Sequence, residues 1–311
     1  MDLSPNISLR SKHAKSEYHG AVTPSRLAVR LALLIALLAL VAAGAGLIDQ
    51  EGTSKTFTTI RGETATLYGR GLYRHDSLMS GSGYLGQDAV VLFLGIPLLL
   101  FATHQYRGGS LRGGLLLSGI LGFILYVYVS MAFGAAYNPL FLLYVALFSA
   151  SLYAFVLTVT SIDLKALPAF IDQQMPRRGP AIFMFAGGAV TLFVWSIPLV
   201  GALLQNRPPD LLDGYTTMVT FGLDLAVITP TCFVTGLLLW RRRPLGLVLA
   251  FPLLLLIVML VPVIILMTIS QVAAGVVFTI PEIVGPIAGF AVLGLFAIWV
   301  LVALLRHIEE A

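Results

Sequence analysis

Long apolar stretches alternate with short polar ones along most of this chain. A helix that crosses a bilayer needs about 20 mostly apolar residues, because the hydrocarbon core is roughly 30 Å thick and each residue rises 1.5 Å. Such stretches lie near residues 28–48, 88–105, 113–136, 139–162, 180–204, 217–240, 245–270 and 286–306. The pattern therefore predicts an all-α integral membrane protein, a bundle of about eight transmembrane helices.

Composition agrees with this pattern. Hydrophobic residues make up 58% of the chain and charged residues 11%, whereas a typical soluble domain is roughly 25% charged. Such a chain cannot cover a water-facing surface with polar groups. Cys232 is the only cysteine, which excludes an intramolecular disulfide and any zinc or iron–sulfur site with several thiolates.

Basic residues predict the orientation, because cytoplasmic connections of membrane proteins are enriched in Lys and Arg. With the N-terminus in the cytoplasm, cytoplasmic segments hold 14 of the 19 basic residues: Arg10, Lys12, Lys15, Arg26, Arg30, Arg107, Arg112, Lys165, Arg177, Arg178, Arg241, Arg242, Arg243 and Arg306. The outer segments hold Lys55, Arg61, Arg70, Arg74 and Arg207. We therefore predict cytoplasmic tails over residues 1–27 and 307–311, flanking a transmembrane domain over residues 28–306.

The first span has an alternative interpretation. Ala43-Gly44-Ala45 resembles a signal-peptidase site that follows an apolar region. Cleavage there would leave seven spans. The polar lead is long for a signal peptide, however, and the apolar run continues past these residues.

The one sizeable polar element is the loop over residues 49–87, predicted to lie outside. Two segments rich in β-branched and aromatic residues, 55–60 and 64–68, flank Arg61-Gly62-Glu63. This order predicts an extracytoplasmic β-hairpin with a tight turn. A lone hairpin is marginal in water, so we expect it to pack on the outer ends of the helices. No internal repeat is visible at the level of motifs.

Asp224 is the one ionisable residue clearly inside a predicted span, and such residues are costly and functional by default. Helical spacing places it near one face with Thr220, Thr231 and Thr235. Pro230 removes a backbone donor there. This stripe is a candidate cation-binding or proton-relay site. The alternative is a structural hydrogen bond from Asp224 to a neighbouring helix.

Gln87 and Asp88 stand at the predicted outer start of the second span. A carboxylate at a helix N-terminus can simply cap free backbone N–H groups. The functional alternative is a polar patch at the outer mouth of the bundle, in which Asp88 and Gln87 join His75, Asp76, Asn138 and Glu282.

Small and aromatic residues recur at helical spacing on the third and fourth spans: Gly119, Gly122, Tyr126, Ser130, Phe133 and Tyr137, then Tyr144, Phe148, Ser151 and Phe155. Small residues let helices approach and hydroxyls bond across them. The stripes predict a helix-packing seam, with a pocket for a lipid tail or a quinone ring as the alternative.

The sequence lacks the residues that several functions require. The histidines are not spaced to ligate haem or a catalytic metal, and there is no H-E-x-x-H sequence or Walker A loop. We therefore expect no metal and no cofactor. No stretch mixes basic and aromatic residues as a nucleic-acid surface does, so no nucleic-acid partner is expected.

Two stretches resemble a family of bacterial multi-spanning membrane proteins to which no activity is assigned. The first contains Gly71-Leu72-Tyr73, Asp76-Ser77, Gly86-Gln87-Asp88, Phe133-Gly134, Asn138 and Leu140 to Val145; the second contains Asp224-Leu225, Pro230 and Arg241 to Gly246. The resemblance touches roughly half of the chain. It implies a protein of the bacterial cytoplasmic membrane and no particular chemistry.

Three functional hypotheses follow. The first is a small-molecule or ion binding or transport protein with an outward-facing polar site, in which Asp224 is the deep acid and Asp88 the rim. The second is a membrane enzyme acting on a lipid-linked substrate at the outer surface. The third is a non-catalytic subunit whose outer loop docks a partner protein.

Overall fold

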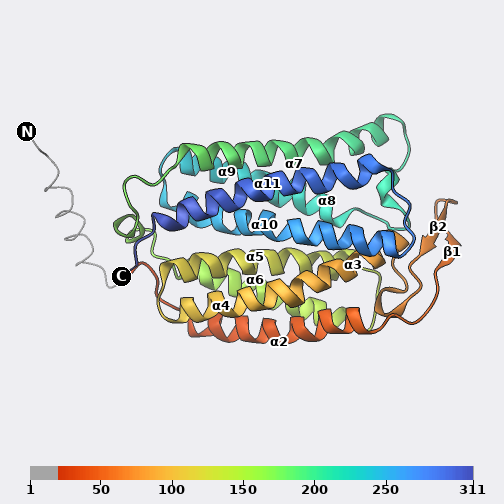
Figure 1. The fold of residues 1–311 in the computed structure, drawn as a ribbon, viewed down its shortest axis with the longest axis horizontal. Coiled ribbons are helices and arrows are strands. Elements are labelled where there is room, and N and C mark those ends of the chain that lie inside the picture. The colour runs from red at the N-terminus through yellow and green to blue at the C-terminus, as the bar shows by residue number, and fades with distance from the viewer. Residues whose placement is uncertain (1–19, 311) are drawn as a thin grey trace, which may run out of the picture.

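The computed structural model describes residues 20–310, and eight of its helical spans are long and apolar enough to cross a membrane (Figure 1). They are α2 (Arg26–Ile48), α3 (Leu78–Val90) continuing into α4 (Ile96–Arg107), α5 (Leu111–Gly134), α6 (Phe141–Thr160), α7 (Arg178–Leu204), α8 (Val219–Leu223) continuing into α9 (Thr229–Trp240), α10 (Pro244–Ala273) and α11 (Ile280–Arg306). Each corresponds to one predicted span. Most of the predicted N-terminal tail, with Arg10, Lys12 and Lys15, lies outside the described residues.

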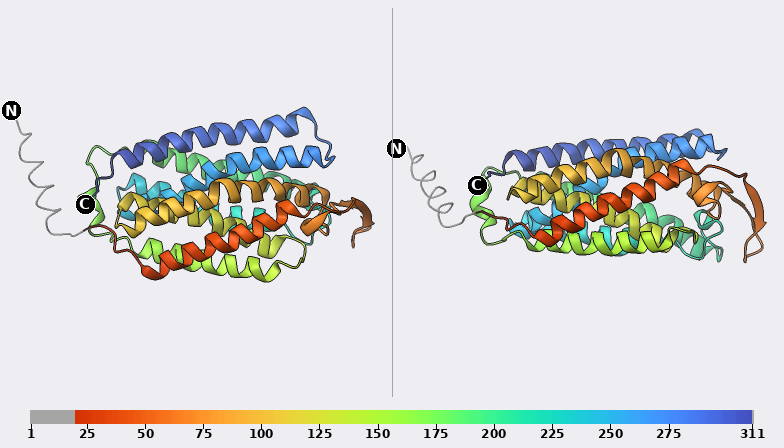
Figure 2. Two further views of the ribbon diagram at one scale, coloured as in Figure 1. Left: turned by 60° about the horizontal axis from the view of Figure 1, so that its bottom comes forward. Right: turned by 90° about the horizontal axis from the view of Figure 1, so that it is seen from below.

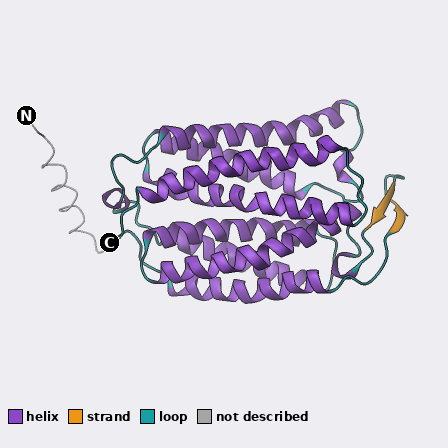
Figure 3. Ribbon diagram, in the orientation of Figure 1, coloured by secondary structure: helices purple, strands orange, loops and turns teal. Residues whose placement is uncertain are grey.

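The helices run side by side, so that the connections gather at two ends of the bundle (Figures 1 and 2). We call one the terminal end, because residues 20–25 and 307–310 lie there with connections 108–110, 161–177 and 241–243. Residues 20–25 and 307–310 are tied to one intervening connection by the bridges of Val22 with Ile162 and of Ile171 with Ile308. The opposite end carries the strands (orange in Figure 3), and we call it the hairpin end.

The second span begins earlier than its predicted start at residue 88. Helix α3 begins at Leu78, where the Ser77 side chain accepts a hydrogen bond from the Ser80 N–H at the first turn. The glycines that suggest turns in the sequence serve close packing instead, because a methyl group on Gly86 would overlap the backbone of α10, and one on Gly81 would crowd Tyr68. Asp88 therefore lies inside a helix rather than at its N-terminus, and the predicted capping role is wrong.

The hairpin is present as predicted. Strand β1 (Lys55–Thr58) pairs antiparallel with β2 (Thr64–Leu67), with Thr58 opposite Thr64. It packs on the connection between α7 and α8: the Arg61 guanidinium donates hydrogen bonds to the carbonyls of Asp213 and Tyr215. A methyl group on Gly214 would touch the Phe57 ring at 2.8 Å. The hairpin thus reaches from the first half of the chain to the second.

The eight spans form two groups of four, one from α2 to α6 and one from α7 to α11 (Figures 1 and 2). In the first group each span packs on the next, and α6 closes the ring against α2. The second group has the same order of neighbours, with α11 returning to α7. Helix α10 joins the groups, because it also packs along α3 and α5.

Each group repeats the same helical hairpin at its second and third spans. A five-residue wide turn (η2, Val91–Gly95, or η5, Asp224–Ile228) precedes a twelve-residue helix whose second residue is Pro97 or Pro230. The positions in the second group lie 133 residues after their counterparts, as these prolines show. Proline has no backbone N–H to donate to the carbonyl four residues earlier. It is tolerated here because the preceding five-residue turn already interrupts that hydrogen-bond pattern.

The turn that follows is also repeated. Gly109 and Arg242 both have positive φ, and their N–H groups bond the carbonyls of Tyr106 and Leu239 at 2.9 and 3.0 Å. One turn later, a methyl group on Gly113 or Gly246 would lie 2.6 or 2.7 Å from the backbone nitrogen of those same two residues. The described structure therefore contains an internal repeat. Comparison of sequence motifs does not show it, because the two turns share backbone geometry but not sequence: residues 108–110 are Gly-Gly-Ser and residues 241–243 are Arg-Arg-Arg.

This repeat predicts that Gly113→Ala and Gly246→Ala both lower the stability of the protein, each by about 1–3 kcal/mol, because the added methyl meets rigid backbone. Thermal unfolding in detergent measures the effect. Gly201→Ala is the matched control: it is also helical and has no atom within 4 Å of the added methyl. Equal melting temperatures for all three variants would contradict the close approach.

Candidate functional site

Asp88 lies about 15 Å along the second span from Leu78, as a rise of 1.5 Å per residue implies. Its side chain is buried, with 4% of its surface exposed. The Tyr73 hydroxyl, from the short helix η1 (Gly71–Tyr73), donates a hydrogen bond to Oδ2 at 2.5 Å. On the other side α2 comes so close that a methyl group on Gly46 would overlap this carboxyl group.

Further tyrosines surround this acid. The rings of Tyr128 on α5 and Tyr144 on α6 stack with centroids 6.3 Å apart, and both phenols face Asp88. The Tyr144 hydroxyl lies beside Tyr73 and Asn138 but makes no hydrogen bond of normal geometry. Aromatic rings with a polar tip suit such a site, because the ring packs in the core while the hydroxyl serves the acid.

Asp76 is a second buried acid, at the hairpin end just before α3. Its Oδ1 accepts hydrogen bonds from the Ala136 N–H at 2.7 Å and from the Tyr215 hydroxyl at 2.8 Å. Burial raises the pKa of Asp76 to about 6, and these two hydrogen bonds oppose the rise. Asp76 thus holds together three connections of the hairpin end, which precede α3, α6 and α8.

The ring of Tyr84 on α3 lies 5.1 Å from that of Tyr73, centroid to centroid. We call these residues the acid–tyrosine cluster: Asp76, Asp88, Tyr73, Tyr84, Tyr128, Tyr144, Tyr215 and Asn138. Four of its buried polar atoms have no hydrogen-bond partner, namely Asp76 Oδ2, Tyr128 OH, Asn138 Nδ2 and Tyr144 OH. A buried unsatisfied group costs about 1–3 kcal/mol, and such groups are rare in native proteins. Buried polar groups normally bond the protein or an ordered water, so the cluster is a candidate binding site.

Asp224 lies in a different environment. The Tyr126 hydroxyl donates to its Oδ1 at 3.0 Å, and Trp195 of α7 lies close to this carboxyl. Because Tyr126 is on α5 and Asp224 begins η5, the bond joins the two groups of helices. A hydrogen bond to a neighbouring helix is the structural role predicted from the sequence as the alternative for Asp224.

Among the described residues, no hydrogen bond joins Asp224 to the threonines predicted beside it. Thr220 is exposed, and the Thr231 hydroxyl donates to the Val227 carbonyl of its own helix at 2.6 Å. The hydroxyl of Thr235 is buried without a partner. The wide turn at Asp224–Ile228 changes the α-helical spacing on which the predicted stripe depended.

The predicted outer-mouth patch assembles only in part. Asp88, Asp76 and Asn138 belong to the cluster, and Gln87 precedes Asp88 with a buried, unpartnered Nε2. His75 is exposed. Glu282 is exposed too, and it caps its own helix: its carboxylate accepts from the Thr279 N–H at 2.7 Å at the start of α11.

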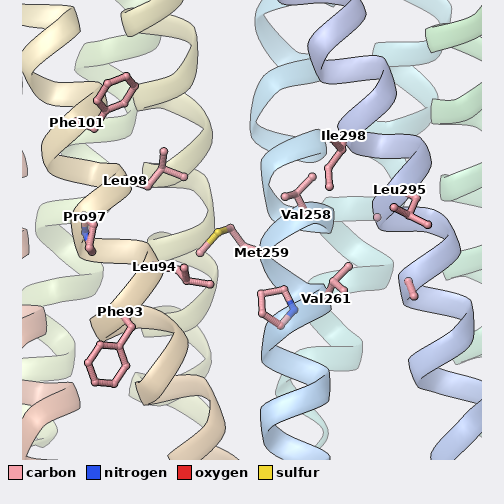
Figure 4. A pocket seen from close by; sticks show the side chains of 13 residues that line it. Phe93, Leu94, Pro97, Leu98, Phe101, Val258, Met259, Val261, Leu295 and Ile298 are labelled. Atoms are coloured by element: carbon pink, nitrogen blue, oxygen red, sulfur yellow. The ribbon is translucent and has the colours of Figure 1, made fainter.

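A large hollow lies elsewhere, between η2 and α4 on one side and α10 and α11 on the other (Figure 4). It has a volume of about 720 Å³ and a wholly apolar lining that includes Phe93, Pro97, Met259 and Leu295. It offers no group for acid–base or metal chemistry. Helices α5 and α6 pack together as predicted, with the rings of Phe133 and Phe148 in edge contact at 5.7 Å. The two glycines of the predicted seam face another helix, because methyl groups on Gly119 and Gly122 would meet Leu255 and Pro252 of α10.

Sequence reasoning missed Tyr73, Tyr84, Tyr128 and Tyr215 as parts of the site. Tyr73 and Tyr84 could have been found because each precedes an acid by three or four residues, Asp76 and Asp88, whereas Tyr128 and Tyr215 have no such signal. Among residues 20–310 no group of three His, Cys, Asp or Glu side chains could hold a metal. Comparison with models of protein families, with curated proteins and with solved structures finds no match.

Asp76 predicts a pH dependence of stability. Its pKa is raised from 3.8 to about 6 on folding, so the stability that protonation contributes is complete below about pH 4 and is lost as pH rises through about 6. Asp76→Asn keeps an acceptor for Ala136 and Tyr215 but does not titrate. We expect this variant to remove up to about 3 kcal/mol of the pH dependence in that interval.

Thermal melts between about pH 4 and pH 7 measure this difference. Glu63→Gln, which alters an exposed carboxylate at the hairpin turn, is the control and should keep the wild-type slope. An unchanged slope in Asp76→Asn would show that another group titrates there.

Proposed function

We propose that the chain is an integral protein of the bacterial cytoplasmic membrane with both termini in the cytoplasm. The eight apolar spans support a membrane location, and an even number of spans returns the chain to its starting side. Most basic residues lie at the terminal end, including the run Arg241 to Arg243. Because cytoplasmic loops are enriched in Lys and Arg, the hairpin end faces outward.

We also propose that the protein binds a small molecule or ion at the acid–tyrosine cluster and carries it across the membrane. The observation that carries this proposal is Asp88, a buried carboxyl group within a span, surrounded by unpartnered polar atoms and without a basic partner. Ion pairs among residues 20–310 involve other acids, Glu63, Asp210 and Glu310. Maintaining such a group inside an apolar bundle is costly, and intramembrane acids mark ion and substrate pathways.

The position of the cluster supports access from the hairpin end. Asp76 lies just before α3, and its partner Tyr215 belongs to the connection that the hairpin covers through Arg61. A substrate that enters from this side meets Asp76 first and Asp88 deeper. The side chains of the cluster fill the space around Asp88, so we propose that the structure represents an occluded state of the site. The connections before α3 and α8 separate it from the hairpin end.

The orientation predicts opposite labelling of two introduced cysteines. Glu63→Cys at the hairpin should react with a membrane-impermeant maleimide on intact cells, and Arg241→Cys should react only after the cells are opened. The unmodified chain is the control, because its single cysteine, Cys232, is buried. Labelling of Arg241→Cys on intact cells would reverse the proposed orientation.

The transport function is tested in proteoliposomes that contain a pH-sensitive dye. Gradients of sodium, potassium, small amines and amino acids are applied in turn, and the movement of protons and of each probe is recorded. We expect one gradient to give a flux above that of empty liposomes. Asp88→Asn should lower it by about tenfold or more, about 1.4 kcal/mol, because the amide still accepts from Tyr73 but can neither carry a charge nor bind a proton.

Asp224→Asn is the matched control, because it makes the same change at the other intramembrane acid. It should lower stability through the bond to Tyr126 and keep the flux in the protein that remains folded. The absence of any flux from the wild type, or equal loss in both variants, would contradict the assignment of Asp88.

A further inference from the structure

We infer that Asp88 is a proton-binding carboxyl group and that the hydroxyl of Tyr144 connects it, through Tyr73, to Asp76 for proton exchange. This inference rests on the proposed site and names its ion. It depends on three observations: the charge around Asp88, the space around it, and the order of hydroxyl groups between the two acids.

The titratable groups that face Asp88 are all phenols. They are Tyr73 on η1, Tyr128 on α5 and Tyr144 on α6. Helix α2 presents the backbone of Gly46, and α10, which packs along α3, contains no titratable side chain. An uncompensated buried charge costs several kcal/mol. A positive charge must therefore neutralise this carboxylate, and the surrounding protein does not supply it.

The space around the carboxyl group favours a proton over a metal cation. A methyl group on Gly46 would overlap Asp88 Oδ2 and would lie 2.7 Å from the Tyr73 oxygen, so backbone and phenol close this side of the carboxyl. A hard metal cation needs about six oxygen ligands around it, and no group of three acids, histidines or cysteines exists among the described residues. A proton needs no added volume.

Hydroxyl groups extend from Asp88 toward the hairpin end. Tyr73 donates to Asp88, and the Tyr144 hydroxyl, close to Tyr73 and Asn138, makes no hydrogen bond of normal geometry. Asp76 accepts its two hydrogen bonds through Oδ1, and its Oδ2 is buried without a partner. In the inferred route the Tyr144 hydroxyl turns between Tyr73 and that second oxygen. At each step a hydroxyl oxygen accepts one proton and releases its own, so the net change is one proton moved from one carboxyl group to the other.

Infrared spectroscopy of the full chain in lipid at neutral pH tests this directly. We expect a band from a protonated carboxyl group that disappears in Asp88→Asn and persists in Asp224→Asn. After transfer to D₂O the band shifts as deuterium replaces the proton, and the rate of this shift measures proton exchange. Tyr144→Phe removes one hydroxyl group from the route and should slow the exchange by about tenfold, as the loss of one hydrogen bond implies. Tyr126→Phe, which removes the hydroxyl beside Asp224 instead, should leave the rate unchanged.

Two outcomes overturn the inference. If no band at neutral pH depends on Asp88, or if the band weakens when sodium replaces a bulky organic cation, the site does not hold a proton. If Tyr144→Phe and Tyr126→Phe exchange equally fast, the route is wrong. If Asp88→Asn does not fold, Asp88→Glu replaces it. This variant keeps a carboxyl group, and a change in the position of the band assigns the band to residue 88. The spectra need no transported solute, so a failed flux experiment does not affect them.

Discussion

The hydrogen bond from Tyr73 to Asp88 places a carboxyl group inside a bundle whose buried surface is otherwise mostly apolar. Much of the local structure follows from enclosing that pair. Glycine at position 46 lets α2 approach the carboxyl group, and glycine at position 86 lets α10 approach the same helix from another side. Because polar groups cannot be left exposed to hydrocarbon, the helices must pack this closely around Asp88 or lose the pair.

The internal repeat shows that this pair is an addition to a more general framework. Each group of four spans contains the wide turn, the proline and the same tight connection to the next helix, which are features of backbone geometry. The acids do not follow the repeat. The counterpart of Asp88 in the second group is Phe221, and the counterpart of Asp224 is Val91. The two halves therefore share a scaffold but use it differently, one to enclose a polar cluster and the other to form the bond to Tyr126.

The sequence was informative wherever one physical rule acts along a single helix or strand. Apolar length predicted all eight spans, and the β-branched segments around Arg61-Gly62-Glu63 predicted the hairpin. Prediction from the sequence failed where contacts between distant segments outweigh the local conformational preference of the residues. The run from Leu78 to Gly86 reads as turns, yet close packing against α10 makes it helical. That error displaced Asp88 to a helix end and hid its relation to Tyr73.

The cluster itself was inaccessible to local reasoning for the same cause. Tyr73, Asn138 and Tyr215 come from three connections that carry no shared motif, and only the fold brings them together. Asp76 and Asn138 were recognised because acids and amides next to apolar spans are conspicuous, whereas tyrosines are common at membrane interfaces and attract no notice.

The hairpin extends this arrangement from one half of the molecule to the other. Arg61 bonds the carbonyl of Tyr215, and the hydroxyl of the same tyrosine bonds Asp76. Any movement that opens the cluster toward the hairpin end must displace Tyr215, and it must therefore also disturb the hairpin or the loop beneath it. Asp224 and Tyr126 join the same two groups deeper in the bundle, and α10 packs along both α3 and α5. The two groups are therefore held together along their length, and Tyr215 is the residue through which the hairpin, the second group and the cluster are coupled at the hairpin end.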